Sequence, residues 1–275
     1  ENGRADFRFY HASMNADTMA HLSLENELRE ALATDQFVLH YQPQIDLRTG
    51  SLVGVEALIR WQHPQRGLVF PDDFVPIAED TGLILPIGDW VLQEACRQLS
   101  QWRSCGLNHI RVSVNLSASQ FLDPNLPDRI NALLRQYGLD ADALDLEVTE
   151  SMTMASPADT IGSMNVLRDN GLTLSIDDFG TGYSSLAYLK MFPISTLKID
   201  RSFVKDIETD RNDADICDVT VLLAHKLGMD VVAEGVEDQA TLDLLREMGA
   251  GQAQGYHFAK PMGLEALLAS SLIGH

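Results

Sequence analysis

Eight polar residues that could do chemistry stand at or just past the ends of short apolar runs. They are Glu56, Asn115, Glu147, Asp177, Asp178, Lys198, Glu234 and Gln254. The five carboxylates and the one lysine carry a net charge of −4, and like charges gathered at low dielectric repel each other strongly. Two divalent cations would cancel this charge, and an oxygen-rich ligand set with one amide favours Mg²⁺ or Mn²⁺ over zinc. Two such ions about 3.5–4 Å apart are the usual arrangement for in-line displacement at phosphorus, so this set predicts a two-metal site.

Each of these residues has a simpler explanation when it is taken alone. A single acid after a strand is more often a solvated loop residue or a helix N-cap, Asn115 is more often a turn residue, and Lys198 is more often on the surface. These explanations fail jointly, because independent surface residues would not follow one strand after another. The eight histidines show no paired metal-ligand spacing, so we interpret them as structural or surface residues.

The elements that must position these residues alternate along the chain. Apolar runs typical of strands occur near 37–45, 52–59, 110–116, 144–149, 172–177, 195–199, 230–234 and 252–258. Helical periodicity begins at Leu22 and recurs over 87–104 and over 127–137. A further helix is expected between Asp238, a predicted N-cap, and Gly249, a predicted C′ residue. Strands that alternate with helices predict βαβ units and a mostly parallel sheet.

The positions of the polar residues decide between an open sheet and a closed barrel. An open sheet would concentrate them at one switch point, whereas here strand after strand supplies a polar group, as on the catalytic face of a TIM-type barrel. The runs 37–45 and 52–59 are joined only by residues 46–51, which are too few for a crossover helix. The expected fold is therefore an α/β, modified TIM-type (β/α) barrel with one antiparallel strand near its start.

The composition of the chain limits its partners and its location. Its 275 residues suffice for one such barrel, and its net charge of −20 excludes duplex nucleic acid as an expected partner, because phosphate binding needs a basic face. No apolar run is long enough to span a bilayer, and the chain opens with the polar stretch ENGRADFRFY, so neither membrane contact nor a signal peptide is expected. The three cysteines form no CxxC pair. The expected location is the cytoplasm, and a membrane-anchored parent protein is compatible with it.

Seven motifs, in order, resemble those of the EAL family of cyclic di-GMP phosphodiesterases over about residues 24–270. They are EALIRWQHP (56–64), VNLSASQF (114–121), EVTE (147–150), DDFGTGYSS (177–185), LKIDRSFV (197–204), VAEGVE (232–237) and QGYHFAKP (254–261). The resemblance implies metal-dependent hydrolysis of cyclic di-GMP to linear pGpG, with two Mg²⁺ or Mn²⁺ ions in each active site.

The resemblance also assigns ligands and catalytic residues. It implies a first metal held by Glu56, Asn115, Glu147 and Asp177, and a second held by Asp177, Asp178 and Glu234. Lys198 matches a lysine that contacts the attacking water or the scissile phosphate, and Gln254 matches a glutamine on the water side of the site. The implied catalytic set is Lys198, Glu56, Glu237 and Gln254.

Other positions match residues that brace a loop or contact substrate. Glu150 and Glu237 resemble acids that brace the loop after Asp178, where Gly180 and Gly182 permit tight turns. The implied substrate contacts are Gln42, Arg60, which would bind phosphate, and Pro261, which lies on the guanine side.

The beginning of the sequence suggests a longer protein. Residues 1–10 resemble the last strand of a GGDEF diguanylate cyclase domain, which makes 11–23 an expected linker and 24–275 the EAL domain. An upstream GGDEF or sensor domain is therefore an expected neighbour.

A homodimer through about 184–192 is also expected, because that stretch has more apolar side chains than one buried helix face needs. The alternative is that all of them pack on the barrel.

Two other functions compete with the phosphodiesterase. The first is a catalytically silent receptor that binds cyclic di-GMP and signals by binding alone. The second is a different metal-dependent barrel lyase or hydrolase with another substrate. The complete set of predicted ligands and Lys198 favours the enzyme over the receptor, and the seven motifs together disfavour a different substrate.

Overall fold

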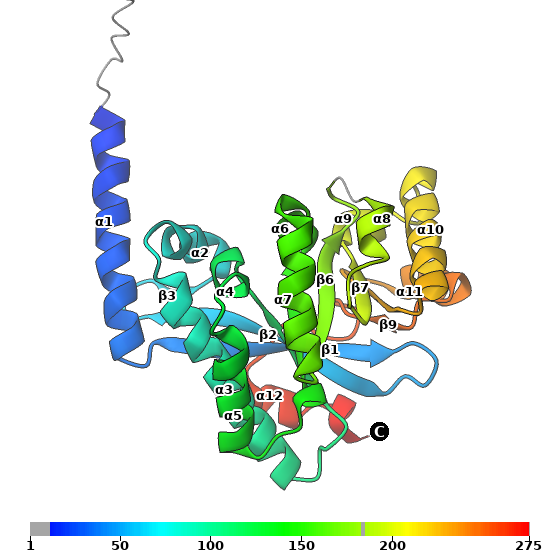
Figure 1. The fold of residues 1–275 in the computed structure, drawn as a ribbon, viewed down its shortest axis with the longest axis horizontal. Coiled ribbons are helices and arrows are strands. Elements are labelled where there is room, and N and C mark those ends of the chain that lie inside the picture. The colour runs from blue at the N-terminus through cyan, green and yellow to red at the C-terminus, as the bar shows by residue number, and fades with distance from the viewer. Residues whose placement is uncertain (1–11, 183–184, 275) are drawn as a thin grey trace, which may run out of the picture. The chain divides into compact units, whose positions relative to one another are not determined.

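The computed structural model describes residues 12–182 and 185–274 of the chain (Figure 1). These residues divide into two compact units. The smaller unit comprises the residues up to 38 and residues 60–87, and the larger unit comprises residues 39–59 and those from 88 onward. The GGDEF strand expected over residues 1–10 lies outside the described residues.

The smaller unit has an aromatic core. The ring centroid of Phe37 lies 6.1 Å from that of Trp61 and 5.8 Å from that of Phe74. Phe74 belongs to α2 (Pro71–Asp80), whereas Trp61 lies in the part of β2 (Leu52–His63) that pairs antiparallel with β3 (Gly67–Val69). The sequence did not predict β3, because three residues of which only the last is buried leave no pattern.

Helix α1 (Ala12–Ala33) also belongs to the smaller unit and begins earlier than its apolar pattern. The periodicity predicts a start at Leu22, but the residues from Ala12 are already helical, including most of the stretch expected to be a linker. Ala and Met are good helix formers, so these residues continue the helix without an apolar stripe of their own.

Eight strands of the larger unit close into a barrel. Their order around the barrel is β1–β9–β8–β7–β6–β5–β4–β2, and β2 pairs again with β1. Strand β1 runs antiparallel to β9, and the pairings from β2 round to β9 are parallel. The predicted modified barrel with one antiparallel strand near its start is therefore confirmed. The strands besides β2 are β1 (Phe37–Asp46), β4 (Arg111–Asn115), β5 (Leu144–Thr149), β6 (Thr173–Phe179), β7 (Thr196–Ile199), β8 (Asp230–Ala233) and β9 (Gln252–Ala253).

Helices connect these strands and cover the barrel (Figure 1). Most match the predicted segments, and α11 has both predicted ends: Asp238 accepts a hydrogen bond from the Thr241 N–H at 2.9 Å, and Gly249 closes the helix with φ 88°. The helices are α3 (Ile84–Ser104), α4 (Ala118–Phe121), α5 (Leu126–Tyr137), α6 (Glu150–Ala155), α7 (Pro157–Asp169), α8 (Leu186–Leu189), α9 (Arg201–Val204), α10 (Arg211–Leu227), α11 (Gln239–Met248) and α12 (Leu264–Leu268), with 3₁₀ turns at Ala141–Ala143 and Ser271–Gly274.

The last strand is shorter than the predicted run 252–258. Strand β9 ends at Ala253, because the chain then turns against the backbone that follows β8. A Cβ atom at Gly255 would lie 2.1 Å from the carbonyl oxygen of Val236, so only glycine fits this contact. The His257 N–H donates to that same carbonyl at 2.9 Å, which replaces the pairing of a regular strand.

The three cysteines are free thiols, and two of them are buried. Among the described residues, none of the helices combines the length and the apolar character that a membrane crossing requires.

Candidate active site

The interior of the barrel is polar, because the strands alternate. Along β5, Leu144, Leu146 and Val148 alternate with Asp145 and Glu147, and all five are buried. Successive side chains of a strand point to opposite faces, so the two acids share one face and the apolar residues share the other. The acids line an enclosed space together with side chains from the other strands, namely Gln44, Arg111, Ser113, Ser175, Thr196, Lys198, Val232 and Gln252. This alternation places polar and charged side chains inside the barrel.

The predicted site residues continue this inward face toward the carboxyl ends of the strands. Asn115 lies two residues after Ser113, Asp177 two after Ser175, Glu234 two after Val232 and Gln254 two after Gln252. The parallel register pairs Asn115 with Glu147 on neighbouring strands. The position at which each strand ends therefore brings residues far apart in the sequence to one place.

Lys198 is the centre of the site. Its Nζ lies 2.6 Å from Glu147, 2.7 Å from Glu234, 3.1 Å from Asp177 and 3.5 Å from Glu56. The residue is 1% exposed, so the simpler explanation of a surface lysine is wrong. Burial alone would lower the pKa of Lys198, but the charges of Glu147 and Glu234 outweigh it and raise the pKa well above its usual value. Lys198 is therefore a permanent cation among acids.

Glu56 is fixed by two amides. Asn115 Nδ2 donates to its Oε1 at 2.7 Å, and Gln254 Nε2 donates to its Oε2 at 2.6 Å. Burial alone would raise the pKa of Glu56, but the charge of Lys198 and these two hydrogen bonds lower it below its usual value. Glu56 is therefore the acid that this site keeps ionised.

Glu147 and Glu234 are shifted the other way. Burial, followed by the charges of Glu56 and Asp177, raises the pKa of Glu147 well above its usual value in spite of Lys198. Burial and the charges of Asp177 and Glu56 raise the pKa of Glu234 to about 8. Glu147 Oε1 is also buried without a hydrogen-bond partner among the described residues. The charged forms of these two acids are therefore disfavoured, and a further cation would stabilise them.

Asp177 and Asp178 end β6 with an irregular backbone. Asp178 has φ 55°, a left-handed conformation that non-glycine residues rarely adopt, and the pairing of β6 with β7 shifts register at this point. The Asp178 N–H donates to Asp177 Oδ1 at 3.0 Å. Partial burial and the charges of Asp177 and Asp200 raise the pKa of Asp178 to about 6. The turn takes Asp178 out of the strict alternation by which a regular strand points two consecutive side chains to opposite faces.

Glu150 holds the start of the loop that follows these aspartates. Its Oε2 accepts hydrogen bonds from the Gly180 N–H at 2.8 Å and from the Gly182 N–H at 3.3 Å. Gly180 has φ 101°, and a Cβ there would lie 2.8 Å from the ring of Phe203. Glu237, the second predicted brace, is exposed and makes no hydrogen bond or ion pair with the described residues.

The donor set fits a hard divalent cation. Glu56, Glu147 and Asp177 each offer a carboxylate oxygen, and these atoms lie within 4.8 Å of one another. Glu234 joins this group through Lys198 and Gln254, whereas the Asp178 side chain makes no hydrogen bond or ion pair among the described residues. Oxygen donors with an unpartnered Glu147 oxygen are suited to Mg²⁺ or Mn²⁺.

Two of the predicted substrate contacts lie near each other. Tyr41 and Met262 form an antiparallel bridge with backbone hydrogen bonds of 2.8 and 3.0 Å. Gln42 follows Tyr41 and Pro261 precedes Met262, so the bridge brings these two residues close together. Both residues are half-buried. Arg60 belongs to the smaller unit, where its guanidinium lies 5.1 Å from the centre of the Phe70 ring.

Two buried polar features were missed by the sequence reasoning. Gln44 lies on the same face of β1 as Gln42 and donates to Gln254 at 3.2 Å. Asp145 accepts hydrogen bonds from Ser175 at 2.7 Å and from Ser113 at 3.3 Å. Gln44 lies two residues after Gln42 and Asp145 lies two residues before Glu147, so strand alternation from these predicted site residues could have identified both.

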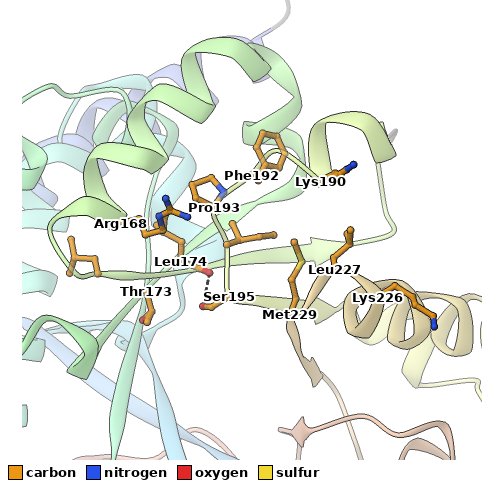
Figure 2. Close-up of a pocket in the computed structure, with 12 residues that line it drawn as sticks. Arg168, Thr173, Leu174, Lys190, Phe192, Pro193, Ser195, Lys226, Leu227 and Met229 are labelled. Atoms are coloured by element: carbon orange, nitrogen blue, oxygen red, sulfur yellow. Dashed lines mark hydrogen bonds between the residues drawn. The ribbon is translucent and has the colours of Figure 1, made fainter.

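A separate groove contains none of the predicted site residues (Figure 2). It has a volume of about 530 Å³ and lies at the beginnings of β6 and β7, where Ser195 Oγ donates to the Leu174 carbonyl at 3.1 Å. Arg168 and Lys226 line it from the last turns of α7 and α10. Basic residues at these positions complement the negative ends of helices, so the groove needs no catalytic explanation.

Comparisons with known proteins agree with this geometry. The sequence model of the EAL domain matches residues 25–261. The bifunctional diguanylate cyclase/cyclic di-GMP phosphodiesterase MucR of Pseudomonas aeruginosa is 46% identical over 270 residues, which are 98% of this chain and 39% of MucR. The cyclic di-GMP phosphodiesterase NbdA of the same organism is 44% identical over 265 residues, which are 96% of this chain and 34% of NbdA.

A solved structure shares the fold as well. The PaMucR phosphodiesterase in complex with c-di-GMP superimposes with a TM-score of 0.87 at 46% identity, covering 89% of this chain and 99% of that one. This chain therefore spans well under half the length of the curated relatives but nearly all of the solved domain. The match over residues 25–261 confirms the resemblance read from the seven motifs, and the chain belongs to the EAL domain family.

Proposed function

We propose that this chain is a metal-dependent phosphodiesterase that hydrolyses one phosphodiester bond of cyclic di-GMP and releases linear pGpG. The observation that carries the proposal is the buried Lys198 with four carboxylates within 3.5 Å at the carboxyl ends of the barrel strands. The names of MucR and NbdA, which include cyclic di-GMP phosphodiesterase, support the same substrate.

The acids and the amide of Asn115 would hold the metal ions. The first set is Glu56, Asn115, Glu147 and Asp177, and the second is Asp177, Asp178 and Glu234. Two bound Mg²⁺ or Mn²⁺ ions would activate the attacking water and polarise the phosphate oxygens. The chain itself supplies orientation, a fixed positive charge and contacts to the substrate.

Each remaining residue has a defined role in this proposal. Lys198 Nζ provides positive charge where negative charge develops on the reacting phosphate. Gln254 orients Glu56 and Glu234 through its amide N–H groups. Arg60 binds a substrate phosphate, Gln42 contacts the substrate and Pro261 lies on its guanine side, while Glu150 holds the loop after Asp178.

One assay separates the enzyme from a silent receptor. The purified chain is incubated with cyclic di-GMP and Mg²⁺ or Mn²⁺, and pGpG is followed by chromatography. Turnover should stop on chelation, and Ca²⁺ should support binding with little turnover because its looser coordination positions the reactants poorly. Binding without any product in Mg²⁺ and in Mn²⁺ would establish the receptor instead.

Metal binding should release protons. The pKa of Glu234 is raised to about 8, first by burial and then by Asp177 and Glu56, so at neutral pH this carboxyl is mostly protonated. A cation that takes the carboxylate displaces the proton, so the apparent affinity for Mn²⁺ should rise with pH up to about 8 and then level off. Titration calorimetry in buffers of different ionisation enthalpy counts the protons, and a heat that does not depend on the buffer would contradict this expectation.

We also propose a homodimer through the segment at about 184–192. Leu186 and Met191 are 61% and 59% exposed, and Tyr188 is 40% exposed, whereas Leu189 and Phe192 are buried. The segment thus presents one apolar side to the barrel and another to solvent, which favours a partner surface over complete packing on the barrel. Light scattering over a range of concentrations tests this, and a strict monomer at high concentration would remove the proposal.

The chain is proposed to be part of a longer cytoplasmic protein. Its matches cover 39% of MucR and 34% of NbdA, so further domains are expected in the parent. The resemblance of residues 1–10 to a GGDEF strand suggests that a cyclase domain precedes residues 24–275, and the free thiols fit a reducing compartment.

A further inference from the structure

Gln44 is a buried glutamine that, among the described residues, donates no hydrogen bond to an acid of the site but donates to the amide that does. It lies on β1, is 6% exposed, and its Nε2 donates to Gln254 Oε1 at 3.2 Å. Gln254 Nε2 in turn donates to Glu56 Oε2 at 2.6 Å and to Glu234 Oε1 at 2.9 Å. Two amides in series thus connect the first strand of the barrel with two of its acids.

The orientation of the Gln254 amide is what this series controls. An amide has a donor end and an acceptor end of nearly the same shape. If the Gln254 side chain turned over, its carbonyl oxygen would face two carboxylates, and both acids would lose a donor in a buried space. The N–H of Gln44 gives the carbonyl end of Gln254 a partner on the opposite side. Gln44 therefore favours the one orientation in which Glu56 and Glu234 are both held.

Gly54 makes room for Gln44. It lies on β2, two residues before Glu56 and on the same face. A Cβ atom at Gly54 would lie 2.8 Å from Gln44 Oε1 and 3.4 Å from the Arg111 carbonyl oxygen. Real Cβ atoms do not approach an oxygen so closely, so a side chain at this position would require the Gln44 amide to move from the place where it donates to Gln254. A glycine inside a strand weakens the strand. Here it leaves the space that the Gln44 amide occupies.

We infer that Gln44 is a positioning residue for the reaction, which acts through Gln254 and depends on the space left by Gly54. The inference rests on the proposed function, in which Glu56 and Glu234 belong to different metal ions. Gln254 ties these two acids together, so the amide series sets the spacing of the two ligand sets. Outer groups that orient metal ligands typically change metal affinity or activity by about 10- to 100-fold when they are removed.

A double-variant cycle tests the inference. Methionine has the length of glutamine without its polar atoms, so Gln44→Met removes the donor and keeps the volume. We expect kcat and Mn²⁺ affinity to fall by about 10-fold or more, with KM for cyclic di-GMP unchanged, because Gln44 acts on the ligands. In a Gln254→Met background, Gln44→Met should have almost no further effect, because its partner is already gone.

Controls separate positioning from packing and from the function itself. Gln98→Met changes another buried glutamine, whose amide pairs with Glu94 at 2.9 Å, and should leave kcat unchanged. Gly54→Ala should act like Gln44→Met, since it displaces the same amide. Effects of Gln44→Met and Gln254→Met that multiply, or wild-type kcat and Mn²⁺ affinity in Gln44→Met, would overturn the inference. If the wild-type chain showed no turnover, the proposed function would fail, and the Mn²⁺ affinities would still decide the role of Gln44.

Discussion

Replacement of Glu56 by alanine should lower kcat for cyclic di-GMP by roughly 10³-fold or more, the scale on which loss of one member of a catalytic unit acts. Glu56 is one of three acids whose oxygens lie within 4.8 Å of one another. Its carboxylate also accepts from Asn115 at 2.7 Å and from Gln254 at 2.6 Å. The variant therefore removes a metal ligand and leaves two buried amides without their acceptor.

Two further variants identify which loss matters. Glu56→Gln keeps the volume but replaces a charged carboxylate, which accepts two hydrogen bonds, with a neutral amide. It should therefore also fail to bind the first metal, and Mn²⁺ affinity should fall. Glu247→Ala removes an exposed glutamate of α11 and is the matched control, which should keep wild-type turnover. Turnover in Glu56→Ala within about tenfold of the wild type would show that this acid is not a ligand in the working enzyme.

The sequence predicted the barrel because its signals are local. Short apolar runs that alternate with helical segments, and the lengths of the connections between them, can be read without knowledge of distant contacts. The antiparallel start followed from residues 46–51 alone, where the Asp46 N–H indeed donates to the Ser51 carbonyl at 3.0 Å. The failures lie where tertiary contacts override the pattern. The chain leaves the sheet at Gly255, because Gly255 packs against the backbone of Val236 and the Val236 carbonyl accepts from the His257 N–H. Strand β3 forms because it pairs with β2.

The sequence predicted several of the side chains that meet in the barrel, but not the contacts between them. The strand ends of β5 and β7 bring Glu147 and Lys198 together, as expected for parallel strands in register. Glu56 was predicted at a strand end as well but lies inside β2, because β2 continues to His63 and pairs there with β3. No pattern showed that a buried lysine would contact four acids, or that Asp178 would adopt φ 55°. The net charge of −4 likewise follows from counting, but its distribution does not. The charge of Lys198 and two hydrogen bonds lower the pKa of Glu56, while burial raises that of Glu234. Both shifts depend on atoms from several strands.

Replacement of Lys198 by alanine tests the enzyme against the receptor. As an enzyme, the chain uses Lys198 on the reacting phosphate rather than on substrate binding. The variant should therefore lower kcat by about 10²- to 10⁴-fold, the range for loss of one transition-state contact or proton-transfer group. Cyclic di-GMP affinity in Ca²⁺ should stay nearly unchanged. In a receptor, turnover is negligible from the start, and only affinity could respond.

Lys198→Ala should also change the thermal stability of the protein, because it removes the ion pairs of Lys198. Without its Nζ, four carboxylates within 3.5 Å lose their common cation, and removal of one partner from a buried ion pair costs about 3–5 kcal/mol. The metal-free variant should thus unfold at a lower temperature than the wild type. Metal affinity should not fall, because the acid cluster becomes more negative, so Mn²⁺ should raise the melting temperature of Lys198→Ala more than that of the wild type.

Matched variants make the Lys198 result decisive. Lys198→Met keeps most of the volume and should lose turnover as Lys198→Ala does, which assigns the effect to the charge rather than to a cavity. Lys226→Ala, an exposed lysine of α10, should change neither turnover nor the response to Mn²⁺. Calorimetry in Ca²⁺, the pGpG assay in Mg²⁺ and thermal unfolding with and without Mn²⁺ give the three readouts on one set of proteins. Wild-type turnover in Lys198→Ala would defeat the mechanism, even with the barrel and the substrate intact, because no other cation of the described residues forms an ion pair with these acids.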